Sequence, residues 1–176
     1  MQKRLIHWER ACCLAVCALG TLGHYLYAWT GRAPIAAAFA SVNESTWEHM
    51  KLFYWPYLLC TAAECTVFGD AFRNYFAVKA AALLLGMVAI PTLHYTVSGA
   101  FGQLPGWGNA AIFYVSAALA YVFSAWALRR GALKNAWMQP VGFGALLAPG
   151  LLFAYWTFRP PALPLFRDPV GGGYGA

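Results

Sequence analysis

The chain has 176 residues, enough for one domain, and it is 61% hydrophobic but only 10% charged. A typical soluble domain carries ~25% charged residues, and a soluble chain of this length cannot bury so much apolar surface in one core. The net charge of +6 comes from basic residues that stand singly or in pairs between apolar runs. The composition therefore excludes a soluble globular domain and a nucleic-acid partner, and membrane lipids become the expected surroundings.

Five apolar segments are long enough to cross a bilayer, which takes ~20 residues of helix. They predict an all-α integral membrane bundle of five transmembrane helices, at about 11–29, 47–68, 75–97, 109–128 and 141–158. The first segment begins like a signal peptide, but His24, Tyr25, Tyr27 and Trp29 extend it to spanning length. We therefore expect it to be a retained helix.

Two stretches outside these helices are expected on the outer side of the membrane. The apolar loop 31–42 is too short to span, so we predict an interfacial or re-entrant segment. The tail 159–176 is rich in Pro and Gly, which predicts a loop docked on the transmembrane domain 1–158.

The distribution of Lys and Arg predicts the orientation. With the N-terminus inside, the inner segments hold Lys3, Arg4, Arg10, Arg73, Lys79, Arg129, Arg130 and Lys134, and the outer segments hold Arg32, Lys51, Arg159 and Arg167. The bias places the N-terminus in the cytoplasm and, after five spans, the C-terminus outside. We expect a multi-pass protein of the cytoplasmic (inner) membrane.

A polar cluster, Asn43-Glu44-Ser45-Thr46-Trp47-Glu48-His49-Met50-Lys51, stands where the second helix begins. Ser45 and Glu48 fit a capping box, in which Ser45 accepts from the amide of Glu48 and Glu48 reaches back to the amide of Ser45. The same spacing allows a functional interpretation: Glu44 and Glu48 share a helix face, and Ser45 and His49 share the neighbouring one. Carboxylate and imidazole groups on adjacent faces can point at one metal ion or one substrate.

Three of the four histidines are expected at the same depth near the outer face, namely His24, His49 and His94. Histidine is the commonest metal ligand, and catalytic zinc sites combine three protein ligands with an open water position. We therefore predict that His24, His49 and His94 bind zinc or another divalent metal. Glu44, Glu48 and Ser45 are the candidate catalytic residues beside it.

The remaining polar and thiol residues carry weaker signals. Five cysteines lie inside apolar runs without a CxxC pair, which predicts free thiols rather than a disulfide scaffold. Glu64, near the inner end of the second helix, is expected either to pair with Lys79 or to line an inner cavity.

The run 43–51 resembles the N-E-S-x-W-E-H-x-K signature of a family of small bacterial membrane proteins of unknown function, and the tail 160–175 is similar to that family's ending. Ser45 and His49 also resemble the S-x-x-x-H element of the alkaline ceramidase and adiponectin-receptor-like superfamily, which are seven-helix zinc-dependent lipid amide hydrolases and their relatives. That resemblance implies zinc at His49. This chain departs from the superfamily because it has no H-x-x-x-H pair and five expected helices.

The first functional hypothesis is an intramembrane metal-binding protein, a zinc-dependent hydrolase of a lipid or amphipathic substrate at the outer leaflet. The second is a small transporter, or an ion- or substrate-binding protein, that uses the same His/Glu cluster as a homodimer. Further alternatives are a haem protein with two axial histidines and a structural subunit.

Overall fold

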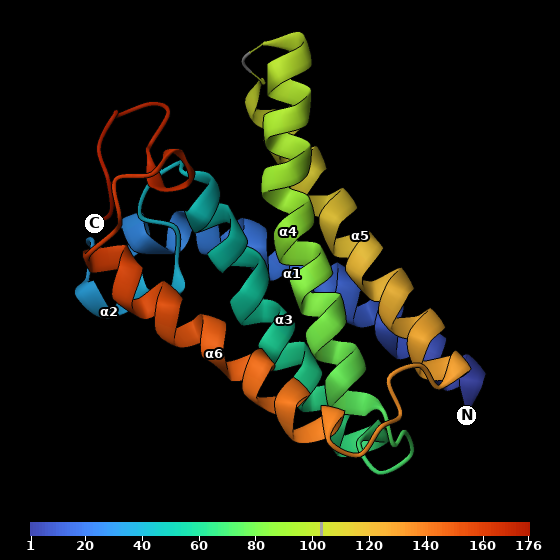
Figure 1. The fold of residues 1–176 in the computed structure, drawn as a ribbon. Coiled ribbons are helices and arrows are strands. Elements are labelled where there is room, and N and C mark those ends of the chain that lie inside the picture. Colours follow the sequence, from blue (N-terminus) through green and yellow to red (C-terminus); the bar gives the residue numbers. More distant parts are fainter. Residues whose placement is uncertain (103) are drawn as a thin grey trace.

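The computed structural model describes residues 1–102 and 104–176, and these residues form helices without any β-strand (Figure 1). The α-helices are α1 (Gln2–Trp29), α2 (Pro34–Phe39), α3 (Thr46–Phe68), α4 (Tyr75–Phe101), α5 (Gly106–Arg130) and α6 (Met138–Phe158), and a short 3₁₀ helix, η1, covers Pro164–Phe166. The expected all-α class is confirmed.

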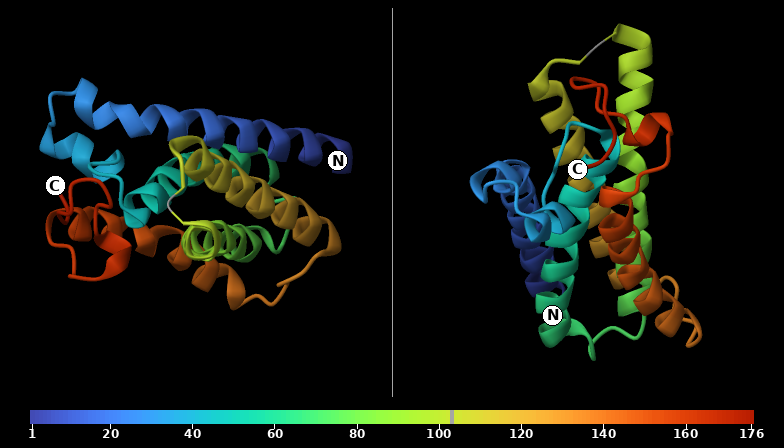
Figure 2. Two further views of the ribbon diagram at one scale, coloured as in Figure 1. Left: turned by 90° about the horizontal axis from the view of Figure 1, so that it is seen from above. Right: turned by 90° about the vertical axis from the view of Figure 1, so that its left-hand side faces the viewer.

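The long helices run back and forth between two ends of one bundle. The N-terminus and the connections 69–74 and 131–137 lie at one end, the N-terminal end, whereas α2 and the C-terminal tail lie at the other, the α2 end (Figures 1 and 2). Helix α1 packs against α3 and α5, and α4 packs against α5 and α6. Every predicted spanning segment coincides with one of these helices.

Four helices among the described residues, α1, α4, α5 and α6, are long and apolar enough to cross a membrane. The multi-pass prediction is thus supported for four of the five expected segments. Helix α3 is not in this group. It spans 23 residues but carries Glu48, Lys51 and Glu64, all of which are buried in the protein.

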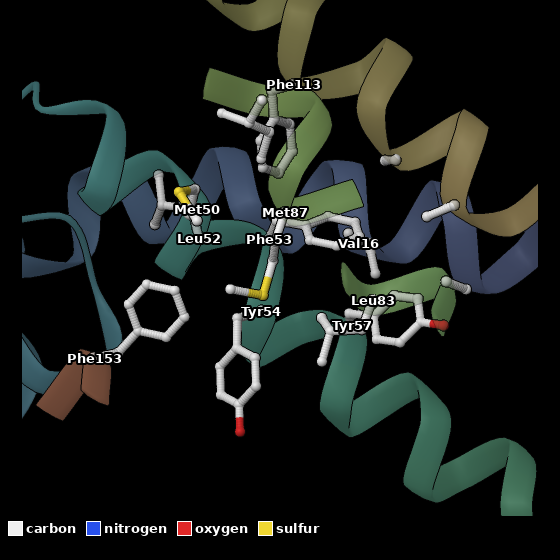
Figure 3. Packing of buried hydrophobic residues seen from close by; sticks show 14 of the residues in the cluster. Val16, Met50, Leu52, Phe53, Tyr54, Tyr57, Leu83, Met87, Phe113 and Phe153 are labelled. Atoms are coloured by element: carbon white, nitrogen blue, oxygen red, sulfur yellow. The ribbon is translucent and has the colours of Figure 1, made fainter. Parts of the chain in front are cut away.

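Helix α3 forms the centre of the bundle because its side chains point to several neighbours at once. Phe53, Tyr54 and Tyr57 of α3 are at most 1% exposed and meet Leu83 of α4 and Phe153 of α6 in the core (Figure 3). The buried hydroxyls find acceptors on other helices: Tyr54 donates to the carbonyl of Leu146 at 2.9 Å and Tyr57 to that of Lys79 at 3.0 Å. Their satisfied hydrogen bonds make these tyrosines compatible with a dry core.

The expected outer loop and tail are both anchored to the α2 end. The loop 31–42 contains α2, and the indole of Trp55 donates to the carbonyl of Ala38 at 3.0 Å. In the tail, Phe166 is buried against Trp47 at a ring-centroid distance of 4.6 Å. The side-chain amide of Asn43 donates to the carbonyl of Gly175 at 3.1 Å.

A buried ion pair between Glu48 and Lys51 stabilises the α2 end of the bundle. The ammonium of Lys51 lies 2.6 Å from a carboxylate oxygen of Glu48, and it also donates to the carbonyl of Ala37 at 2.7 Å and to the hydroxyl of Thr157 at 2.9 Å. The same carboxylate oxygen accepts from the amide of Val42 at 3.0 Å. Lys51 thus uses all three of its donors and connects α2, α3 and α6.

Close contact between α4 and α6 depends on Gly142. A Cβ added there would lie 2.6 Å from the Cα of Ala77 and 2.7 Å from its nitrogen, which are backbone atoms that cannot rotate away. Gly144, two residues on, has no atom within 4 Å of such a Cβ. The two glycines therefore form a matched pair on one helix.

We expect Gly142→Ala to destabilise the protein by about 1–3 kcal/mol, because the methyl group must push α6 away from α4. Gly144→Ala, the control, should be neutral or stabilising by at most about 1 kcal/mol. Denaturant titration in mixed micelles measures both. Equal effects of the two substitutions would show that α4 and α6 do not pack as described.

We expect Lys51→Met to cost roughly 3–5 kcal/mol of unfolding free energy, because it leaves the buried Glu48 carboxylate without its counter-charge. Adding Glu48→Gln should restore part of this loss, since the charge is then removed as well. The exposed Lys134 offers the control, with an expected change within about 0.5 kcal/mol for Lys134→Met. A Lys51→Met variant as stable as the parent would contradict the buried pair.

Candidate metal centre

The start of α3 follows only half of the expected capping box. Ser45 is the N-cap, and its hydroxyl accepts from the amide of Glu48 at 3.4 Å, as predicted. The predicted reciprocal bond from the Ser45 amide to Glu48 is wrong, because this amide donates to the side-chain oxygen of Asn43 at 2.9 Å. Glu48 turns to Lys51 instead, because an ammonium one turn further along is a stronger partner for a buried carboxylate than a neutral amide.

The neighbouring Glu44 is free to point elsewhere because it precedes the helix. Helix α3 begins at Thr46, so Glu44 and Glu48 do not share a helix face as expected. The Glu44 carboxylate lies between two imidazoles: its Oε1 is 3.2 Å from Nε2 of His24, and its Oε2 is 3.9 Å from Nε2 of His49. The carboxylates of Glu44 and Glu48 thus have different environments.

His24, Glu44 and His49 form a group whose ligand atoms, one from each residue, all lie within 4.8 Å of one another. The two imidazole rings have centroids 5.6 Å apart. His24 comes from α1, Glu44 from the connection before α3, and His49 from the first turns of α3. Two imidazole nitrogens and one carboxylate oxygen are a donor set that zinc accepts.

The backbone fixes the orientation of His49. Its Nδ1 lies 2.9 Å from the carbonyl oxygen of Ser45, which can only accept, so Nδ1 carries the hydrogen and donates it. In the neutral ring, Nε2 then carries a lone pair that can bind a metal ion, and it lies 3.9 Å from Oε2 of Glu44. Histidines that bind metals are commonly held in this way by a carbonyl. Ser45 therefore acts on the group through its main chain, while its hydroxyl caps the helix.

The charges in the group favour an ionised Glu44. The hydrogen bond from His24 holds the pKa of the Glu44 carboxyl below its usual value, opposed by the partial burial of the carboxyl and assisted by the positive charge of His24. The Glu44 side chain remains 42% exposed. An ionised and accessible carboxylate is in the form that binds a metal ion.

His94 lies beside this group rather than in it. Its Nδ1 is 3.1 Å from the side-chain oxygen of Asn109, and it lines a small cavity of about 20 Å³ together with Glu44 and His49. The structure therefore gathers the predicted His24 and His49 but fills the third position with Glu44. Glu48, expected near the metal, faces Lys51 on the other side of the helix start.

A pocket of about 270 Å³ opens next to the group. His24, Glu44 and His49 form its polar wall, and the rest is mainly apolar. A hydrogen bond of 2.9 Å between the hydroxyls of Thr21 and Tyr114 closes one side between α1 and α5. The remaining lining residues are Gly20, Tyr25, Leu52, Gly106, Asn109, Ala110 and Phe113.

A second group of ionisable residues lies at the N-terminal end. Glu64 pairs with Lys79 at 2.6 Å, which confirms one of the two expected roles, and Glu9 joins them at 3.0 Å. Nothing in the sequence singled out Glu9, because it stands among the charged residues that precede the first apolar run. Helix α1 begins at Gln2, well before that run, and buries Glu9 in the bundle.

The five cysteines are free thiols, as predicted.

No curated protein and no solved structure matches the chain. A family model described as a family of unknown function matches residues 2–176. Because this match covers almost the whole chain, the protein belongs to that family, DUF6512.

Proposed function

We propose that the protein binds one divalent metal ion, zinc by ligand type, through His24, Glu44 and His49, and uses it to hydrolyse an amphipathic substrate at the outer face of the membrane. The observation that carries this proposal is the convergence of three ligand atoms within 4.8 Å of one another. They come from two helices and the connection between them, and they border a pocket.

The spacing of the donors supports a shared ion. Two ligands of a tetrahedral ion with bonds of ~2.0–2.1 Å lie about 3.3 Å apart. Oε1 of Glu44 lies 3.2 Å from Nε2 of His24 and Oε2 of Glu44 lies 3.9 Å from Nε2 of His49, and one ligand atom from each of the three residues lies within 4.8 Å of the others. The exposed Glu44 can adjust by side-chain rotation, whereas the Ser45 carbonyl holds the His49 ring in place.

Three protein ligands leave a fourth position open towards the pocket. An ion bound there would acidify a water molecule at this position, towards a pKa of ~7, and so supply a nucleophile at neutral pH. The mainly apolar lining suits a hydrocarbon chain, and the polar wall suits the bond to be cleaved. Lipids and other amphipathic esters or amides fit this pattern.

The proposal includes a topology of five spans. Helix α3 counts as the fifth, because its charged residues are buried and paired inside the protein: Glu48 with Lys51, and Glu64 with Lys79. The excess of Lys and Arg at the N-terminal end supports a cytoplasmic position for this end. The metal centre, at the α2 end, faces the outside.

This topology predicts termini on opposite sides of the membrane. In sealed vesicles of known orientation, an epitope tag at the N-terminus should be protected from added protease on the outer side, and a tag at the C-terminus should be cleaved. Detergent-treated vesicles, in which both tags are cut, are the control. If both tags were found on the same side of the membrane, the topology of five spans would be contradicted, and α3 would not count as a transmembrane helix.

Metal binding is tested by titrating Zn²⁺, with Co²⁺ as a spectroscopic probe, into the purified protein in detergent. We expect one ion per chain. His24→Ala and His49→Ala should each weaken binding by more than the ~10–100-fold that is typical when a residue that only orients a ligand is removed. Hydrolysis of a chromogenic medium-chain ester should fall with occupancy in the same variants.

Two further histidines complete the design. His7→Ala, at the exposed N-terminal end, should leave binding unchanged, and His94→Ala should still bind one ion, because His94 lies outside the group. If His94→Ala abolished binding and removing the Glu44 carboxylate did not, the ligands would be the three histidines. Stoichiometric binding that survives both His24→Ala and His49→Ala would exclude this centre.

A further inference from the structure

A charged triad lies inside the N-terminal end of the bundle, far from the candidate metal centre. Lys79 of α4 is 2.6 Å from Glu64 of α3 and 3.0 Å from Glu9 of α1. Each of these three residues is at most 2% exposed. Glu9 and His24 are separated by about 22 Å along α1, at 1.5 Å per residue. The triad is therefore independent of the metal proposal.

Helices α1, α3, α4 and α5 surround the triad. The hydroxyl of Ser124 on α5 donates to Oε1 of Glu9 at 2.6 Å. The Lys79 ammonium lies 5.7 Å from the ring centroids of both Tyr75 and Tyr121, within the range of cation–π attraction. The titratable groups around the triad are Cys12 and Cys13 of α1, Tyr57, Cys60 and Cys65 of α3, Tyr75 of α4 and Tyr121 of α5.

The charges in the triad do not balance. Among the described residues, no second basic side chain is ion-paired with Glu9 or Glu64. Two ionised carboxylates and one ammonium leave a net charge of −1 in a space closed to water. Such an uncompensated buried charge is costly, and proteins avoid it by neutralising a group.

The hydrogen bonds in the triad are incomplete in the same place. Within residues 1–102 and 104–176, Oε2 of Glu9, Oε1 of Glu64 and the hydroxyl of Tyr121 are buried and have no hydrogen-bond partner. The Glu48–Lys51 pair at the other end is different, because it is neutral and all three ammonium donors are used. A neutral pair would suffice to stabilise the fold. The second carboxylate therefore calls for another explanation.

We propose that Glu9 and Glu64 are a proton-binding site: together they hold one exchangeable proton beside Lys79. The proton adds to one carboxylate oxygen as an O–H bond, and no other bond is made or broken. The remaining carboxylate and Lys79 form a neutral pair. Two carboxylates that share one proton are a known arrangement where like charges meet in a closed space. Intramembrane carboxylates of this kind serve proton relays and proton-coupled transport.

Infrared spectroscopy of the purified protein at neutral pH tests this proposal. We expect the carbonyl stretch of a protonated carboxylic acid in the unmodified protein, and we expect it to shift in D₂O. Both Glu9→Gln and Glu64→Gln should lose this band, because the single remaining carboxylate pairs with Lys79 and ionises. Asp70→Asn, at an exposed acid of the same end, is the control and should retain the band.

The spectrum of the unmodified protein is decisive even if a variant does not fold. Absence of a protonated carboxyl band at neutral pH would overturn the proposal and leave both carboxylates ionised. A band that does not shift in D₂O would show that the proton is not exchangeable, which also overturns it. A band that persists in both glutamine variants would place the proton on another group.

Discussion

The arrangement of this bundle depends on the pairing of charged side chains that helix α3 carries into the protein. An ion that leaves water for an apolar interior loses several kcal/mol even after the surroundings relax, unless a counter-charge and hydrogen bonds replace the water. Helix α3 carries buried ions at both of its ends, where Glu48 pairs with Lys51 and Glu64 shares Lys79 with Glu9 of α1. The partners bring α1, α4 and α6 into fixed positions around α3.

The two ends of α3 satisfy this requirement to different degrees. At the α2 end, Glu48 and Lys51 are neutral as a pair, and every ammonium donor has an acceptor. At the N-terminal end, two carboxylates face one ammonium, and two carboxylate oxygens have no partner in the part of the chain that the structure describes. Charged groups whose charges and hydrogen bonds are all satisfied stabilise the fold. Charged groups with unsatisfied hydrogen-bond acceptors are where a ligand or a proton can bind.

The same reasoning separates Glu44 from Glu48, which stand four residues apart. Glu48 is already paired with Lys51, its Oε2 also accepts from the amide of Val42, and its side chain is only 2% exposed. Glu44 precedes the helix, is 42% exposed and lies beside the imidazoles of His24 and His49. Glu48 thus stabilises the fold, whereas Glu44 remains available to a ligand. In this way the short polar run 43–51 both caps helix α3 and contributes to a site.

The sequence alone predicted the membrane class and most helix boundaries to within a few residues, because the length of apolar runs and helix periodicity are local properties. It also identified His24, His49 and Glu44 as candidate site residues. The start of α1 was not predicted, since Leu5 and Glu9 extend it into the bundle beyond the apolar run. Only the tertiary structure decided the partners: Glu44 in place of His94, Lys51 for Glu48, and Glu9 for Lys79. Such pairs depend on the rotation and register of one helix against another, which core packing sets and no local pattern specifies.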